Sequence, residues 1–183
     1  MHRAGVLALL RRHARTELEP LEAEMTADTI RFVESNADCL LRSQLEGHLT
    51  GSAWIIDATG TKTLLTHHLK LNKWVQLGGH ADGDSDLWQV AQREAHEESG
   101  LRQWEVRSKE IFDLDRHLIP GRNRVPEHYH YDLRFVFEAD PREPLIVSAE
   151  SKELAWVSLD QVAVINPEES MARMVKKSRL LAD

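Results

Sequence analysis

The spacing of apolar residues changes about a quarter of the way along the chain. Over the first part, apolar side chains recur three and four positions apart, which is typical of amphipathic helices. Thr26 and Asp28 offer polar residues at which a second helix can begin. Short extended runs follow. We therefore expect an N-terminal helical extension over residues 1–46 and a domain over residues 47–183.

Most of the later chain consists of short runs with the alternation of strands. Residues 52–57 and 63–68 flank the sequence Ala-Thr-Gly-Thr, which predicts a β-hairpin. A third run, over residues 72–77, ends at two consecutive glycines. A polar loop over residues 120–126 separates two later runs. In all, strands are expected at residues 52–57, 63–68, 72–77, 111–118, 128–138, 145–147 and 154–157.

Start and stop signals place helices around these strands. A central helix over residues 86–99 ends at Gly100, where a residue without a Cβ can adopt the left-handed conformation. Ser158 opens a capping box that predicts a short helix, and Pro167 suits the first position of a last helix. This order of elements predicts an α+β fold, an α/β/α sandwich with a mixed β-sheet.

Glutamates of the central helix lie where apolar residues are expected. On a helical wheel, Glu94 and Glu98 fall inside the apolar stripe and Glu97 falls at its edge. Unpaired carboxylates that face inward cost several kcal/mol each, so they need a cation or a proton. Carboxylate oxygens at positions i, i+3 and i+4 suit hard cations such as Mg²⁺ or Mn²⁺. The helix therefore predicts a divalent-metal site, against the alternative of a solvated acidic face.

The same segment contains a long motif. The sequence from Gly79 to Ser85, seven further residues, and then Arg93-Glu-Ala-His-Glu-Glu-Ser-Gly-Leu101 resembles the Nudix box, G-x5-E-x7-R-E-U-x-E-E-x-G-U, where U is an apolar residue. The second half matches at every fixed position, and the total spacing is intact. The resemblance implies a Nudix-like α/β/α sandwich, to which the first 46 residues are an extension.

The resemblance implies a role for each polar residue of the box. Glu97 and Glu98 would bind Mg²⁺, with Mn²⁺ as the alternative ion. Glu94 would be a further ligand or the general base, and the carbonyl of Gly79 would complete the site. Arg93 would orient the glutamates through an ion pair rather than contact the substrate.

Nudix domains commonly add one more acid from a late loop, six residues before a tryptophan that ends the loop. Glu150 stands six residues before Trp156, so we expect it in the catalytic metal site. Glu153 is the rival residue. The alternative is that Glu150 is an ordinary solvated loop acid.

One position departs from the box. Ser85 stands where the family has its early glutamate, which helps to hold the box arginine and the start of the helix. Asp84 and Asp86 flank this serine, and either could replace the glutamate. Alternatively, Asp84 or Ser85 is simply the N-cap of the helix.

Further candidates lie outside the box. His128, His130 and Asp132 share one face of a predicted strand, because side chains alternate. This spacing could bind a transition metal, place two imidazoles beside a phosphate chain, or belong to a half-solvated sheet face. We expect the phosphate or surface outcome over the metal one, because an oxygen-ligand site already accounts for the chemistry. Lys73 is a further candidate contact to substrate phosphate.

Composition narrows the class of protein. The length of 183 residues suits about one domain, and the formal net charge of −7 does not indicate a nucleic-acid or anionic-membrane surface. A single cysteine, Cys39, excludes a disulfide framework and fits a reducing compartment. No apolar run reaches the length of a membrane span. We therefore expect a cytoplasmic protein with no membrane or nucleic-acid partner, and leave a homodimer open.

Together these features predict a Nudix-type pyrophosphohydrolase. It would use Mg²⁺ to hydrolyse a diphosphate bond in a small phosphoanhydride substrate, a nucleoside diphosphate linked to another group. One alternative is a degenerate Nudix module that binds a nucleotide as a sensor, which Ser85 favours and the intact box glutamates oppose. Another is a prenyl-diphosphate isomerase, which shares the fold but needs a catalytic cysteine in its core domain.

Overall fold

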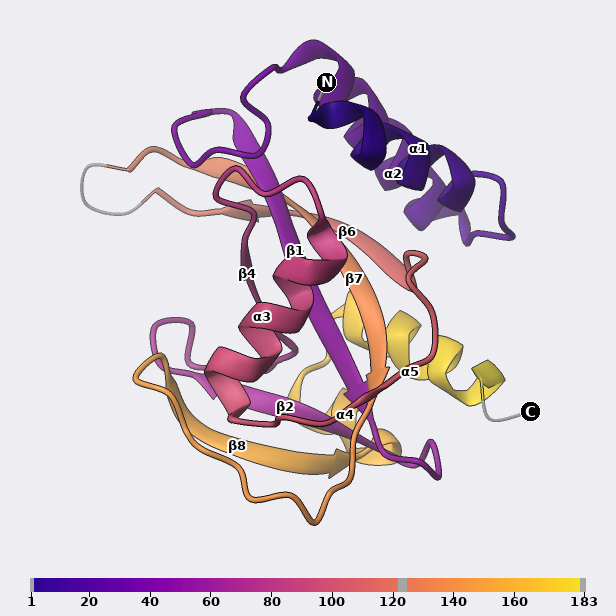
Figure 1. Cartoon of the computed structure of the whole chain (residues 1–183), viewed down its shortest axis with the longest axis vertical. Helices are drawn as coiled ribbons and strands as arrows, with labels where there is room; N and C mark the ends of the chain where they lie inside the picture. The colour runs from indigo at the N-terminus through magenta and orange to yellow at the C-terminus, as the bar shows by residue number, and fades with distance from the viewer. Residues whose placement is uncertain (1, 122–124, 182–183) are drawn as a thin grey trace.

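The computed structural model describes residues 2–121 and 125–181, and its centre is a curved mixed β-sheet (Figure 1). The strands are β1 (Gly47–Ile56), β2 (Lys62–His68), β3 (Lys73–Val75), β4 (Leu77–His80), β5 (Glu105–Val106), β6 (Asp113–Ile119), β7 (His128–Glu138) and β8 (Ser151–Ser158). The hydrogen-bonded order is β3-β2-β1-β7-β5, with β4, β6 and β8 added to β1, β7 and β2. β1 and β7 run parallel along their length, and the other pairs are antiparallel.

Helices cover both faces of this sheet. They are α1 (Arg3–His13), α2 (Pro20–Ser35), α3 (Leu87–Ser99), α4 (Leu159–Ile165) and α5 (Glu169–Leu181). Alternate residues of β1 enter two cores, because successive side chains point to opposite faces. Leu49 and Ile55 pack in the core that includes α3, whereas Trp54 and Ile56 pack with α4 and α5. The expected α+β sandwich with a mixed sheet is thereby confirmed, with α3 on one face and α5 on the other (Figure 1).

The N-terminal helices pack against the same core as α3. Val6 and Leu10 of α1 and Phe32 of α2 belong to that core, and the ring of Phe32 stacks on Tyr131 of β7 with the centroids 4.1 Å apart. The extension therefore has its apolar face covered by the sheet. The predicted division into residues 1–46 and 47–183 stays a prediction. None of the described helices is both long and apolar enough to cross a membrane.

Several predicted element boundaries are wrong. α2 begins at Pro20 and continues through Thr26, because proline suits the first turn of a helix. The last helix begins at Glu169, two residues after Pro167. The two glycines that were expected to end a strand lie inside β4 instead.

The strand expected at residues 145–147 is also wrong. The backbone N–H of Ile146 donates to the carbonyl of Ser99 at 2.7 Å. This segment is therefore hydrogen-bonded to the last residue of α3 and does not form a strand. The polar loop predicted over residues 120–126 includes residues 122–124, which lie outside the described residues. The long strand predicted at residues 128–138 is confirmed as β7.

A buried charge network joins β6, β7 and α5 to the N-terminal helices. Asp113 is fully buried and accepts hydrogen bonds from Arg173 at 2.7 and 2.9 Å, from Arg134 at 3.1 Å and from Lys177 at 2.9 Å. The same ammonium of Lys177 donates to both carboxylate oxygens of Glu22 on α2 at 2.6 Å. Paired and hydrogen-bonded in this way, charges can be buried without prohibitive cost.

Candidate functional site

The glutamates of α3 meet the backbone of β4 on the inner side of the helix. Glu98 is 7% exposed, and its Oε2 accepts the backbone N–H of Gly78 at 3.0 Å. The side chain of Glu94 is 19% exposed, whereas that of Glu97 is 60% exposed. The helical phase therefore predicted the burial of Glu98 correctly, while Glu94 is partly buried and Glu97, at the edge of the stripe, is exposed.

Glycines allow α3 to lie this close to the sheet. A Cβ on Gly79 would lie 2.3 Å from the carboxyl carbon of Glu94, and a Cβ on Gly51 would lie 2.6 Å from the carbonyl oxygen of Leu87. Gly79 and Gly51 are partners in the pairing of β4 with β1. The main chain at Gly79 therefore lies directly against the Glu94 carboxylate, where a side chain would separate them.

The electrostatics of these carboxylates favour a bound cation. Burial, together with the neighbouring charges of Glu94 and Glu150, raises the pKa of Glu98 to about 7. Burial also raises the pKa of Glu94, although Arg93 lowers it in part. A cation among these oxygens would offset both the burial and the mutual repulsion. The donors are all oxygen atoms, so the site fits a hard divalent ion such as Mg²⁺.

Arg93 contacts the glutamates of its own helix. Its Nη2 donates to Oε1 of Glu94 at 3.0 Å and to the carbonyl of His80 at 3.3 Å. Its Nε lies 3.9 Å from Oε1 of Glu97, one turn further along. These contacts hold Glu94 in place and join the helix to the end of β4.

Glu150 lies in the turn that precedes β8. Its carbonyl accepts the N–H of Leu69 at 2.8 Å, and its side chain is exposed. The carboxylate is close enough to α3 that its charge raises the pKa of both Glu94 and Glu98. Glu153 instead lies within β8, opposite His67 of β2. This placement favours Glu150 over Glu153 as the late acid.

Comparison with known proteins decides the family. A family model described as the NUDIX domain matches residues 48–178, which include α3 and most of the sheet. The chain belongs to the Nudix family. Membership in it supports a hydrolase, and Nudix enzymes generally use a divalent metal. No curated protein sequence matches the chain significantly.

Solved Nudix structures share the fold at low sequence identity. The Nudix hydrolase RenU from M. smegmatis is 23% identical over 74% of this chain and 86% of its own, with a TM-score of 0.55. The Ap4A hydrolase of C. elegans, in a binary complex, is 19% identical over 73% and 97%, with a TM-score of 0.54. The MutT protein of Methanosarcina mazei Go1 is 18% identical over 75% and 96%, with a TM-score of 0.56. These likenesses establish the fold.

The departure of this Nudix box at Ser85 has a structural consequence. Asp86, and neither Asp84 nor Ser85, is the N-cap of α3, and its Oδ1 accepts the N–H of Gln89 at 3.2 Å. Asp84 accepts the N–H of Asp86 at 2.9 Å. The two flanking acids therefore hold the loop and the start of the helix. Arg93 is held by a hydrogen bond to Glu94, by the ion pair with Glu97 and by a hydrogen bond to the carbonyl of His80.

We expect Ser85→Glu to be tolerated and to leave activity unchanged or higher. Ser85 is partly buried just before the N-terminus of α3, where a carboxylate is favoured by about 0.3–1 kcal/mol through the helix dipole. Steady-state kcat and the thermal midpoint of the variant check this. A severe loss of kcat would show that the local geometry here has no room for the family's glutamate.

Lys73 lies on β3 in an exposed ion pair. Its ammonium contacts the carboxylate of Glu168, immediately before α5. The structure therefore places this amine against an acid rather than against the glutamates of α3. Its predicted contact with substrate phosphate stays a prediction.

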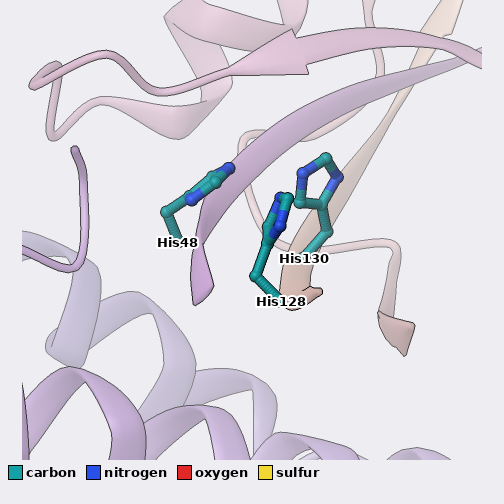
Figure 2. Close-up of side chains that lie close together, drawn as sticks. All are labelled: His48, His128 and His130. Atoms are coloured by element: carbon teal, nitrogen blue, oxygen red, sulfur yellow. The ribbon is translucent and has the colours of Figure 1, made fainter. Parts of the chain in front are cut away.

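The strand face that was predicted to hold His128, His130 and Asp132 divides into two parts. Asp132 is buried and accepts hydrogen bonds from four side chains of the sheet and its edge, Thr50, Ser52, Gln76 and Arg134. It therefore lies in a hydrogen-bonded cluster of its own. The two histidines lie instead beside His48 of β1 (Figure 2).

His130 is a neutral ring at neutral pH. Burial lowers its pKa to about 2, with further contributions from His117 and His80. A contact between this ring and a substrate phosphate would rely on hydrogen bonding alone. The sequence did not indicate His48, His80 or His117, because their proximity depends on strand register that no local pattern reveals.

Proposed function

We propose that this chain is a Mg²⁺-dependent pyrophosphohydrolase. Its substrate class is a nucleoside diphosphate linked to another group, cleaved by water at the diphosphate bond. The observation that carries the proposal is a pair of carboxylates packed against a glycine main chain, that of Glu98, which is buried, and that of Glu94, which is partly buried. The single cysteine, Cys39, is free and buried, and it fits the reducing environment of the cytoplasm.

Five groups of this chain would hold the metal: the carboxylates of Glu94, Glu97, Glu98 and Glu150 and the carbonyl of Gly79. Burial of Glu98 and the repulsion that it shares with Glu94 and Glu150 support this assignment. When bound, the metal neutralises phosphate charge and makes an attacking water more acidic. In the absence of the ion, the same burial favours protonation of Glu98.

A carboxylate close to the attacking water must accept its proton. Glu94 suits this role because burial raises its pKa above the usual value of a glutamate and because Arg93 fixes its orientation. Glu150 is the second candidate, since it approaches the same carboxylates from the loop before β8. Arg93 is a positioning residue, because its contacts go to glutamates and to the main chain of β4.

The two other functions receive less support from the described residues. A prenyl-diphosphate isomerase needs a reactive cysteine, but Cys39 is 0% exposed and burial raises the pKa of its thiol. A nucleotide sensor without catalysis needs no buried carboxylate set, and the glutamates of α3 are all present.

A hydrolysis screen tests the proposal. Purified protein is incubated with dinucleotides, nucleotide sugars, ADP-ribose and nucleoside triphosphates, with Mg²⁺ or with EDTA, and the products are separated by ion-exchange chromatography. We expect at least one compound of the first three classes to be cleaved at its diphosphate bond in Mg²⁺ and none in EDTA. Nucleotide binding without turnover in any condition would instead indicate the sensor.

Glu150→Gln should reduce kcat at least ten times more strongly than Glu153→Gln. Glu150 acts electrostatically on the carboxylates of α3, whereas Glu153 lies on β8 opposite His67. Both variants lose one exposed loop or strand carboxylate, so they are matched in charge. Kinetics at saturating Mg²⁺ check the difference. Equal losses in the two variants would remove Glu150 from the site.

A further inference from the structure

Five histidines gather on one face of the sheet. His48 of β1 is the register partner of His130 of β7, which is in turn the partner of His117 of β6. His128 lies two residues before His130 on the same face, and His80 lies on β4 beside His48. The centroids of neighbouring rings are 4.9–5.5 Å apart. Such a cluster is not required by the chemistry of the Nudix box.

Three of these rings have the spacing of a metal site. One ring nitrogen each from His48, His128 and His130 lies within 4.8 Å of the others, and Figure 2 shows the three rings side by side. Among the residues that the structure describes, no other trio of histidine, cysteine or acidic side chains has this spacing. The nitrogens of a tetrahedral zinc site lie about 3.4 Å apart, given Zn–N bonds of about 2.0–2.1 Å. Small ring rotations would bring the trio to that distance.

Neither ring nitrogen of His48 makes a well-formed hydrogen bond with any residue that the structure describes. The residue is 4% exposed, and the backbone of Gln44 lies close enough to one ring nitrogen to raise the pKa of the ring in part, against the larger effect of burial. A buried polar atom without a partner is costly, and a bound ion or ligand is one way to offset that cost. The lone pair of one His48 nitrogen is therefore available to a metal inside the cluster.

His128 is held in the tautomer that a metal requires. Its Nδ1 lies 2.9 Å from the carbonyl oxygen of Pro126, so Nδ1 carries a proton and, in the neutral ring, Nε2 keeps its lone pair. Metal-binding histidines commonly donate their second ring N–H to a carbonyl in this way. The ring also borders a surface pocket shared with Glu46 and Glu127, whose charges would attract a cation toward it.

In place of the phosphate or surface role expected from the sequence for His128 and His130, we propose that these two residues and His48 bind a divalent transition metal ion, Zn²⁺ above all, at a site separate from the glutamates of α3. Imidazole nitrogens suit Zn²⁺, Ni²⁺ or Cu²⁺ rather than Mg²⁺. A phosphate would need a cationic side chain, but the nearby guanidinium of Arg42 forms two 2.6 Å hydrogen bonds with Asp82. Three protein ligands leave a fourth position for water or for His80.

A zinc titration tests this site. Metal-free full-length protein competes with a chromophoric chelator for Zn²⁺ in excess Mg²⁺, which occupies the oxygen site. We expect one Zn²⁺ per chain, and at least a hundred-fold loss of affinity in the double variant His128→Ala, His130→Ala. His2→Ala removes an exposed histidine elsewhere and should bind as the wild type does. Equal thermal midpoints without metal confirm that the variants are folded.

A second measurement needs no variant. X-ray absorption at the zinc edge of the loaded wild type should show about three imidazole nitrogens in the first shell. A shell of oxygens only, or unchanged zinc affinity in the double variant, would overturn the site. So would absence of zinc binding together with a raised KM in the double variant, which would assign the histidines to substrate phosphate. Loss of Mg²⁺-dependent hydrolysis would not affect the zinc result, so this proposal and the proposed function fail separately.

Discussion

Glu98→Gln is expected to lower Mg²⁺-dependent kcat by about a hundred-fold or more while the protein stays folded. Glutamine is nearly the same size and can still accept the N–H of Gly78 through its carbonyl oxygen. It removes the negative charge from the most buried carboxylate of the site. Glu24→Gln, an exposed glutamate of α2, is the matched control and should keep wild-type kcat.

The same variant has a predictable effect on stability without metal. The pKa of Glu98 is raised from 4.5 to about 7 on folding, so between these values the folded state binds more protons than the unfolded state. The contribution of this group to stability is therefore present below pH 4.5 and is lost as the pH rises through 7. In EDTA above pH 7, the thermal midpoint of Glu98→Gln should equal or exceed that of the wild type. Wild-type activity in the variant would refute its role as a metal ligand.

Asp113→Ala is expected to lower the free energy of unfolding by about 3–5 kcal/mol. The carboxylate of Asp113 is the common partner of Arg134, Arg173 and Lys177, and its loss removes the acid that these three cations share in the interior. Denaturant unfolding measures the change. Asp140→Ala, which breaks an exposed ion pair with Arg142, is the control and should change stability little.

A small effect of Asp113→Ala would show that water or the remaining acids compensate the cations, and that the network does not fix the packing of α5. A large loss of stability would also involve the N-terminal helices. Lys177 binds Asp113 and Glu22 at once, so loss of Asp113 also weakens the attachment of α2 to the sheet.

The part of the site that lies on α3 could be predicted from the sequence, because the helical periodicity and the Nudix box point to the same residues there. The phase of Glu94 and Glu98 on a single helix predicts their burial, and the spacing of the box predicts that Gly79 lies near them. These are local relations, set by the geometry of one helix and the turn before it. The long strand β7 was predictable for the same reason.

Relations between distant segments were not predictable in this way. His48 and His130 are 82 positions apart, and only the parallel register of β1 and β7 makes them neighbours. Asp113 and Arg173 meet across two layers, and neither has a local signal for burial. Asp132 shares a strand face with two histidines. However, Thr50 and Ser52 of the neighbouring strand donate hydrogen bonds to Asp132, so it belongs to a different cluster from the histidines.

In the proposed reaction, this Nudix chain uses the carboxylates of α3 and a divalent metal to add water across a diphosphate bond. This reaction is tested most directly by turnover in ¹⁸O-labelled water of the compound that the screen finds best. We expect one ¹⁸O atom in one phosphate product per bond cleaved, with Mg²⁺ required and with the rate nearly abolished in Glu98→Gln. Turnover that persists in EDTA, or products that contain no ¹⁸O, would contradict it.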